Sequence, residues 1–281
     1  MTTVRALPRK GATKPSAVPP DILRRLNRGE IETANLAEGL AVDFVALLGE
    51  IVPPLKKSAA PHFTAAPGIV RRMAIAAELL LDHKGKRGID ELQRHPADTV
   101  RGWAAFMIGL TPNLSLRERL KKMKPLADDP HFGVREWAWL ALRTHIATDA
   151  VEAISLLRPW TSDSSANIRR FAVESTRPRG VWCTHIDILK RQPKKALPLL
   201  EPLRDDPAIY VQNSVGNWLN DAGKSSPEFV TTLCRRWMKE SMAPATLRIV
   251  KRAQRSLATP VALPPQTHSS VSNRRLKSKL V

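Results

Sequence analysis

An acidic side chain stands in one of the most basic segments of the chain. The segment NIRRFAVESTRPRGVWCTHI places Glu174 among four arginines, Arg169, Arg170, Arg177 and Arg179. Guanidinium groups keep a neighbouring carboxylate ionised, and an ionised carboxylate beside phosphates can stabilise a cationic intermediate. The simpler alternative is an ion pair between Arg170 and Glu174 within one helix, which contributes roughly a few tenths of a kcal/mol.

The segment YVQNSVGNWLNDAGKSSPEF is a second candidate for a functional site. Asn213, Asn217, Asn220 and Asp221 follow one another at helical spacings, and Lys224 comes three residues after Asp221. Asp221 falls where we expect the helix to end. Polar capping of a helix C-terminus is therefore the alternative interpretation of this segment.

The aromatic side chains are unusual in type, since the chain has seven tryptophans and one tyrosine. An exposed indole can stack on a sugar, a base or a cation, although most tryptophans in helical arrays belong to the core. Trp137 and Trp139 are two residues apart, so one of them is expected to point away from the core or to flank it. Trp160 and Trp182 are expected to be exposed.

Motifs for metals and nucleotide cofactors are missing from the sequence. It contains no glycine-rich phosphate loop, zinc-protease helix, CxxC pair or nucleophile elbow, and its seven histidines show no ligand spacing. Cys183 and Cys234 are the only cysteines, which excludes a disulfide framework and indicates a reducing, intracellular setting. We expect neither a metal nor a cofactor.

The chain is strongly basic, with 45 Lys and Arg against 26 Asp and Glu and a net charge of +19. Residues 1–20 and 257–281 carry four of these charges each, which leaves +11 for the part between them. A basic folded body usually binds a polyanion, most often nucleic acid, because counterions are released on association. A basic surface that serves solubility alone is the other possibility.

The chain divides into three parts. Residues 1–20 and 257–281 are rich in proline, lack periodicity and are expected to be disordered basic arms. Residues 21–256 show apolar side chains at helical spacing nearly throughout, which predicts an all-α body. The apolar runs are shorter than the roughly 20 residues that cross a membrane.

One pattern recurs within this body. It aligns at His95, Asp129, Asp163 and Asp206, with offsets of 34, 34 and 43 residues, a period typical of a solenoid of helix pairs. The aligned stretches are HPADTVRGWAAFM, DPHFGVREWAWLA, DSSANIRRFAVES and DPAIYVQNSVGNW. In each, an aliphatic residue follows after five positions, a basic or amide residue after six and a small apolar residue after nine. Asp129–Pro130 and Asp206–Pro207 are expected to start helices, with the carboxylate as the cap.

The second helix of each pair is expected to line a concave surface. Arg101, Arg135, Arg169 and Arg170 would then form a basic stripe along it, suited to a duplex backbone. The alternative is that these arginines pair with acids of neighbouring helices and hold the stack together.

Two segments carry a family resemblance. RRFAVESTRPRGVW and YVQNSVGNWLNDAGKSSP resemble the signature stretches of the AlkC branch of DNA alkylation-repair proteins, which are relatives of the AlkD glycosylases. The resemblance begins at LNRGEIETANLAEGLAVD and runs to about Trp237, roughly three quarters of the chain. It implies an all-α, HEAT-like helical-repeat solenoid with a concave basic surface for residues 21–256. Some AlkC relatives carry a C-terminal immunoglobulin-like domain, which we do not expect after Leu257.

The resemblance implies a monofunctional DNA glycosylase. Its substrates would be cationic N-alkylated bases in duplex DNA, of the 3-methyladenine type and with 7-methylguanine or 3-methylcytosine as further candidates. The N-glycosidic bond would be hydrolysed without base flipping and without a cofactor. The implied catalytic residues are Glu174 and Asp221, with Glu136 of VREWAW as a third. The implied substrate contacts are Trp139, Trp182 and Asn217, and the implied DNA contacts are Arg101, Arg135, Arg169, Arg170, Arg177, Arg179 and Lys224.

The expected partner is double-stranded DNA with alkylated bases, bound by a monomer in the bacterial cytoplasm at the nucleoid, with no membrane contact. Two other classes of protein remain open. One is a non-catalytic HEAT-like protein that binds DNA, and the other is an α-solenoid scaffold that binds acidic proteins.

Overall fold

The computed structural model describes residues 9–64, 66 and 68–258, and all regular structure within them is helical. The predicted all-α body is therefore confirmed. The first half of the array contains α1 (Pro20–Asn27), α2 (Leu36–Ala41), α3 (Phe44–Ile51), α4 (Lys56–Thr64), α5 (Gly68–Lys84), α6 (Arg87–Leu92), α7 (Asp98–Leu110) and α8 (Leu116–Ala127). The second half contains α9 (Phe132–Thr148), α10 (Ala150–Leu157), α11 (Ala166–Glu174), α12 (Asp187–Arg191), α13 (Leu197–Leu200), α14 (Ile209–Gly223), α15 (Pro227–Glu240) and α16 (Pro244–Ala253).

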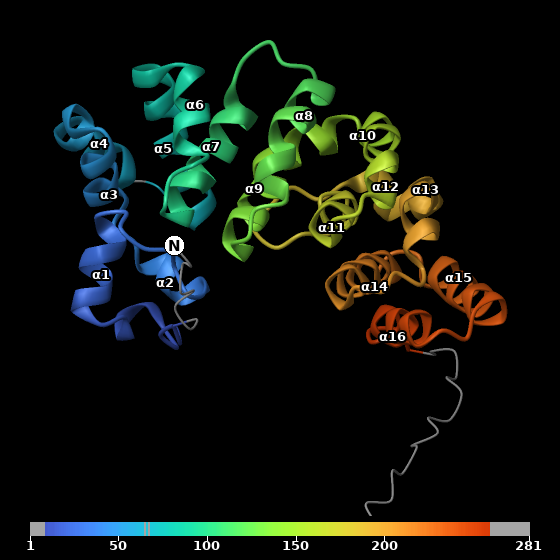
Figure 1. The fold of residues 1–281 in the computed structure, drawn as a ribbon. Coiled ribbons are helices and arrows are strands. Elements are labelled where there is room, and N and C mark those ends of the chain that lie inside the picture. The colour runs from blue at the N-terminus through green and yellow to red at the C-terminus, as the bar shows by residue number, and fades with distance from the viewer. Residues whose placement is uncertain (1–8, 65, 67, 259–281) are drawn as a thin grey trace, which may run out of the picture.

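The helices form a curved stack whose two ends turn toward the same side (Figure 1). An inner row runs along the curve, in which α5 packs on α7, α7 on α9, α9 on α11, α11 on α14 and α14 on α16. The helices α6, α8, α10, α13 and α15 lie outside this row (Figure 1). The second helices of the sequence repeats are α7, α9, α11 and α14, so the repeats predicted from the sequence occupy the inner row.

The apolar positions of the repeat fill the core as predicted. The aliphatic residues five positions after the start of each repeat are almost inaccessible, and so are the small residues at position nine. These side chains are Val100, Val134, Ile168 and Val211, with Ala104, Ala138, Ala172 and Val215. Their burial on one face of each inner helix explains why the pattern recurs, because each helix pair needs its neighbour to remove this face from water.

The first residue of each repeat organises a turn rather than capping the helix. Asp129 Oδ1 accepts the backbone N–H of His131 at 2.7 Å, and Asp206 Oδ1 accepts that of Ala208 at 2.8 Å. Helix α9 therefore begins only at Phe132, with His131 as its cap, and α14 begins at Ile209. The predicted helix starts at Asp129–Pro130 and Asp206–Pro207 were two residues too early, because these carboxylates serve the turn.

The basic residue at position six closes the same turn. Arg135 Nη1 donates to the carbonyls of Asp129 and Pro130 at 2.6 and 2.9 Å. Arg101 Nη1 bonds the carbonyls of His95 and Pro96 in the same way, Arg169 Nη1 those of Asp163 and Ser164, and Gln212 that of Asp206. We call this arrangement of a side-chain acceptor and a returning donor the repeat turn.

Two of these arginines also join one repeat to the next. Arg101 Nε lies 2.8 Å from Asp129 Oδ2, and Arg169 Nε lies 2.6 Å from Asp206 Oδ2. Arg101 and Asp129 are both buried. The structure thus shows the pairing with acids of neighbouring repeats that was the alternative to a basic stripe, although phosphate contact by these arginines stays a prediction.

Part of the predicted N-terminal arm is folded. Arg9 pairs with Glu38, a fully buried carboxylate of α2, and the amide of Asn35 donates to the carbonyl of Ala12 at 2.8 Å. A buried carboxylate needs a cation or hydrogen-bond donors, and Arg9 supplies both. The expectation of a disordered arm over residues 1–20 therefore does not describe the segment from Arg9 onward, while residues 1–8 lie outside the described part.

The predicted C-terminal elements fall on α15 and α16, and residues 259–281 of the predicted tail lie outside the described residues. No helix in the part of the chain that the structure describes has the length and apolar character that crossing a bilayer requires.

Replacing Asp129 with alanine should destabilise the array. The change leaves Arg101 buried with only Glu32 as an acidic partner and removes the acceptor for the His131 N–H. We expect the free energy of unfolding to fall by about 2 to 3 kcal/mol, measured by urea denaturation followed by circular dichroism. Asp82→Ala, at an exposed carboxylate of α5, is the control and should change it by less than about 0.5 kcal/mol. Equal stability of both variants would contradict a structural role for the repeat turn.

Candidate functional site

Three carboxylates and three cations alternate across the inner helices. Arg170 Nη2 of α11 lies 2.6 Å from Glu136 Oε1 of α9 and 3.7 Å from Glu174 Oε2 at the end of α11. Arg177, in the loop after α11, bonds Glu174 Oε1 at 2.7 Å and Asp221 Oδ2 of α14 at 2.7 Å. Lys224 Nζ follows at 3.6 Å from Asp221 Oδ1. We call the series from Glu136 to Lys224 the carboxylate network.

The three predicted catalytic carboxylates are therefore brought together, but their exposure differs. The side chains of Glu174 and Asp221 are each 5% exposed, whereas that of Glu136 is 34% exposed. Glu136 was the third candidate from the sequence, yet it is the one that a molecule on the inner surface can reach most directly.

The carboxyl of Glu174 is held in its ionised form. Burial alone would raise the pKa of Glu174, but the charges of Arg170 and Arg177 outweigh it, together with the hydrogen bond from the Ser214 hydroxyl at 2.5 Å. The pKa of Glu174 consequently lies below its ordinary value. Only two of the four arginines around Glu174 in the sequence reach it, because Arg169 binds Asp206 and Arg179 donates to Ser225 at 2.7 Å.

The single tyrosine supports the arginine at the start of the network. The guanidinium carbon of Arg170 lies 4.4 Å from the centre of the Tyr210 ring, and that of Arg135 lies 5.1 Å from it. Arg135 Nε also donates to the Tyr210 hydroxyl at 3.3 Å. These cation–π contacts hold two of the predicted DNA-binding arginines beside each other on α9 and α11.

The tryptophans differ from expectation in part. Trp137 and Trp139 are both buried, so neither points away from the core. Trp139 is nevertheless part of the site, because its indole N–H donates to Glu136 Oε2 at 2.7 Å and fixes that carboxylate. Trp160 is only half-buried and packs on Phe171 with a ring distance of 5.2 Å. Trp182 is exposed as predicted, at 54%.

A buried arginine of α9 fixes the loop that carries Trp182. Arg143 is 2% exposed and donates to the carbonyls of Ser175, Arg177 and Thr184, at 2.8, 2.6 and 2.8 Å. These carbonyls lie on both sides of the loop tip, where Trp182 takes the left-handed backbone conformation with a φ of 63°. That conformation is costly for a residue other than glycine, so the bonds from Arg143 help to maintain it.

Asn217 lies beside the network but is engaged by another helix. Its side-chain oxygen accepts a hydrogen bond from Arg252 Nε of α16 at 2.8 Å. The sequence indicated Asn217 as a substrate contact, and the structure gives it an arginine partner that sequence reasoning did not include.

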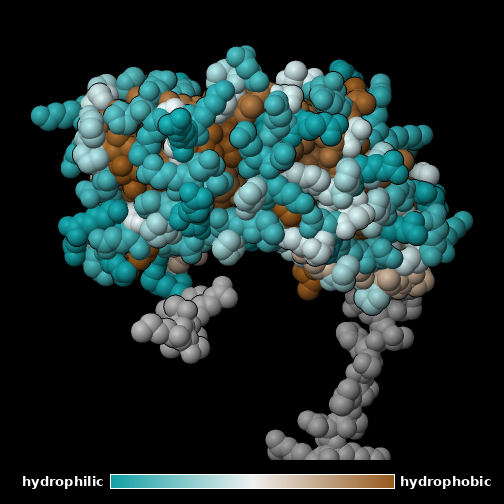
Figure 2. Space-filling model, turned by 45° about the horizontal axis from the view of Figure 1, so that its top comes forward, coloured by the Kyte–Doolittle hydropathy of each residue, from teal (hydrophilic) through white to brown (hydrophobic). Residues whose placement is uncertain are grey.

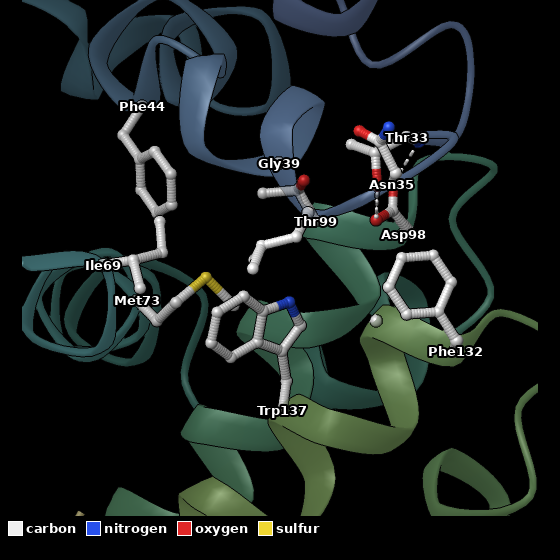
Figure 3. A pocket seen from close by; sticks show the side chains of 12 residues that line it. Thr33, Asn35, Gly39, Phe44, Ile69, Met73, Asp98, Thr99, Phe132 and Trp137 are labelled. Atoms are coloured by element: carbon white, nitrogen blue, oxygen red, sulfur yellow. Dashed lines mark hydrogen bonds between the residues drawn. The ribbon is translucent and has the colours of Figure 1, made fainter. Parts of the chain in front are cut away.

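A small cavity lies at the other end of the inner row. Figure 3 shows Phe44, Met73 and Trp137 around its apolar part, with Asp98 and Thr33 hydrogen-bonded at its polar side. The cavity has a volume of about 30 Å³, room for about two water molecules. None of the residues that line it belongs to the carboxylate network, and it is too small to hold a nucleobase.

Sequence reasoning missed two side chains that shape the site. Ser214 and Arg143 lie in helices α14 and α9, at positions that no spacing distinguishes from ordinary polar positions. Their roles depend on which backbone and side-chain groups the neighbouring repeat presents to them. In the residues that the structure describes, no three His, Cys, Asp or Glu side chains gather as a metal site would require.

The chain is similar to known proteins in sequence and in fold. A family model for HEAT repeats matches residues 88–177. The uncharacterised protein YhaZ of Bacillus subtilis (strain 168) is 36% identical over 117 residues, which are 42% of this chain and 32% of YhaZ. The match thus spans about a third of the length of that relative.

Two solved structures share the curved helical array. The alkylpurine DNA glycosylase AlkC of Pseudomonas fluorescens, solved with DNA containing an abasic site analogue, has a TM-score of 0.61 and 23% identity over 76% of this chain and 61% of AlkC. AlkD2 from Streptococcus mutans has a TM-score of 0.56 and 23% identity over 73% of this chain and 100% of AlkD2. The chain has the HEAT-like fold of AlkC and AlkD2, which confirms the predicted resemblance for the fold.

The lowered pKa of Glu174 predicts how stability depends on pH. Because the folded state favours the carboxylate, the contribution of Glu174 is present above its ordinary pKa of 4.5 and is lost as the pH falls. Glu174→Gln should be less stable than the unsubstituted protein at about pH 7, and the difference should shrink toward about pH 3. Urea denaturation at a series of pH values measures this difference. A difference that does not change with pH would contradict an ionised, paired Glu174.

Proposed function

We propose that this protein is a monofunctional DNA glycosylase that removes cationic N-alkylated bases from duplex DNA. The observation that carries the proposal is the carboxylate network, in which Glu136, Glu174 and Asp221 come from three successive inner helices into one connected site. The shared fold with AlkC, which was solved on DNA, supports the same function.

The chemistry needs little from the protein beyond charge and position. An alkylated base that carries a positive charge leaves readily, so no general acid has to protonate it. The bond between C1′ and the base nitrogen breaks, and its electron pair leaves with the base and cancels the positive charge. Water bonds to the oxocarbenium-like C1′, its proton passes to a carboxylate, and an abasic sugar remains.

The network assigns different roles to its members. Glu136 is the accessible carboxylate and is positioned by Trp139, so we assign it to the sugar and the attacking water. Glu174 and Asp221 lie behind it and are fixed by Arg177, which pairs with both carboxylates. Trp182, on its rigid loop, is assigned to the lesion nucleotide through its exposed ring.

The duplex itself would be held by the basic residues around the network. Arg101, Arg135 and Arg169 already hold the repeat turns, so a phosphate would have to compete with those bonds. Arg170, Arg177, Arg179 and Lys224 flank the carboxylates and are assigned to the phosphates next to the lesion. Figure 2 shows that hydrophilic residues cover much of the face in view.

We further propose that a monomer acts at the bacterial nucleoid, without a cofactor and without extruding the base. The substrate class is that of 3-methyladenine, with 7-methylguanine and 3-methylcytosine as the next candidates.

One observation favours a second function, that of a non-catalytic DNA-binding protein. The three carboxylates of the network are balanced by Arg170, Arg177 and Lys224, so the network as a whole has no net negative charge. Catalysis then requires that phosphates draw some of these cations away from the carboxylates. A protein that only binds duplex DNA would keep the pairs intact.

Release of bases from methylated duplex DNA tests the proposal. The unsubstituted protein should release 3-methyl and 7-methyl bases above the spontaneous rate, measured by chromatography of the free bases. Glu136→Gln, Glu174→Gln and Asp221→Asn should each lower the rate about 100-fold, because each removes negative charge next to the developing cation. Glu152→Gln, at an exposed carboxylate of α10, is the matched control and should keep the full rate.

Duplex binding, measured in parallel, separates the alternatives. Binding without any base release would overturn the enzyme proposal in favour of the non-catalytic DNA-binding protein. Absence of both would favour an α-solenoid that binds other proteins.

A further inference from the structure

Three asparagine–arginine pairs in strict register join helix α14 to α16 and to the turn that follows α16. Arg248, Arg252 and Arg255 donate to the side-chain oxygens of residues that precede each of them by 35 positions. The pairs are Arg248 with Asn213 at 3.3 Å, Arg252 with Asn217 at 2.8 Å and Arg255 with Asn220 at 3.1 Å. We call these six residues the asparagine–arginine ladder.

The asparagines of the ladder do not neutralise the charge of its arginines. In the earlier repeats Arg101 and Arg169 pair with Asp129 and Asp206, whose negative charges cancel theirs. In the ladder the acceptor is a neutral amide, and no ion pair among the described residues includes any of the three arginines. A guanidinium has five N–H donors, so a single amide oxygen orients it and leaves further donors available.

The arginines of the ladder are close enough to repel one another. Burial lowers the pKa of Arg252, and the charges of Arg255 and Arg248 lower it further. The carboxylate of Glu174 opposes this shift, but the neighbouring cations outnumber it, and an excess of positive charge raises the local affinity for anions. Helices α14 and α16 also approach each other closely, because α14 has glycine at position 216, where a Cβ would lie 2.8 Å from the Cβ of Arg252.

The ladder continues from the carboxylate network on the same helix. Asn220 directly precedes Asp221, and Asn213 directly precedes Ser214, the hydroxyl donor to Glu174. Arg248 and Arg252 lie about one helical turn apart, about 6 Å along the axis of α16, and Arg255 follows in the turn after this helix. Three oriented cations at this spacing match a linear series of monoanions better than a single compact anion.

We propose that the asparagine–arginine ladder binds consecutive phosphates of one DNA strand and fixes the register of the duplex against the carboxylate network. This inference rests on the proposed function, because it assumes that the inner surface binds DNA. It assigns to α16, the last helix of the array, a role that the predicted arginine stripe did not include. The neutral acceptors are essential to it, since aspartates at the same positions would cancel the charge that phosphates require.

Introducing those aspartates provides the sharpest test. Asn213→Asp combined with Asn217→Asp keeps every arginine but supplies carboxylates in place of the amides. Binding to a fluorescent, undamaged duplex is measured by anisotropy at several KCl concentrations. The slope of log K against log salt should become shallower by about 0.9 for each phosphate that the variant no longer binds, and affinity at about 0.1 M salt should fall about tenfold per phosphate.

A second variant and a control distinguish lost phosphate binding from unfolding. Arg252→Gln should make the slope shallower by about 0.9, the value for one phosphate. Arg235→Gln, at an exposed arginine of α15 outside the inner row, should leave the slope unchanged. Circular dichroism verifies that each variant is folded. An unchanged slope for both the double aspartate variant and Arg252→Gln would overturn the ladder proposal.

The outcomes for the ladder and for the enzyme are distinguishable. If the unsubstituted protein releases methylated bases while the ladder variants keep the full salt slope, the ladder proposal fails and the glycosylase stands. If the ladder variants have a shallower slope on undamaged DNA but no bases are released by any protein, the ladder stands as a DNA-binding element and the enzyme fails. Binding of polyaspartate that depends on the ladder, without binding of duplex DNA, would assign the ladder to an acidic protein and overturn it as a phosphate site.

Discussion

The hydrogen bonding of the repeat turn is the constraint on which the rest of the structure depends. Each turn between two helices of a pair buries backbone carbonyls and N–H groups that need partners. A side-chain acceptor at the first position and a donor six residues later, as in Asp129 and Arg135, supply them from within the repeat. Because an acceptor and a donor recur at these two positions, successive inner helices enter the stack with similar geometry. The carboxylates that α9, α11 and α14 carry are thereby brought to one place.

The partner of the arginine changes along the array, and its electrostatics change with it. In the first repeats an aspartate neutralises the arginine, as in the pair of Arg101 with Asp129. In the carboxylate network acidic and basic side chains alternate, so that each arginine lies between two carboxylates. At the last pair of inner helices an amide takes the place of the acid, as in Asn217 with Arg252, and the positive charge remains. Similar helix packing thus produces neutral ion pairs in the first repeats, an alternating series of charges in the carboxylate network, and unneutralised positive charge at the asparagine–arginine ladder.

Much of this arrangement could be predicted from the sequence because it depends on period and residue type. The core positions such as Val134 and Ala138, the inner row and the gathering of Glu174 with Asp221 all follow from a repeat of helix pairs and from the family resemblance. The helix starts could not be predicted, since the carboxylate of Asp129 is used by the N–H of His131 in its own turn and by Arg101 of the preceding repeat. The hydrogen bonds of Arg143 could not be predicted either, because its partners are backbone carbonyls, which every residue type has. The ladder did leave a signal, the common offset of 35 residues, which a search for charged repeats alone overlooks.

The hydrogen bonds from Arg143 also order the loop around Trp182 as the protein folds. Three carbonyls from both sides of the loop are bound by one side chain of α9, so the loop and the inner helix behave as one rigid piece. The conformational entropy of this segment is therefore lost when the protein folds, not when a ligand arrives. The exposed indole is therefore in place before a ligand arrives, and under the proposed function the adjustment on contact is made by the DNA.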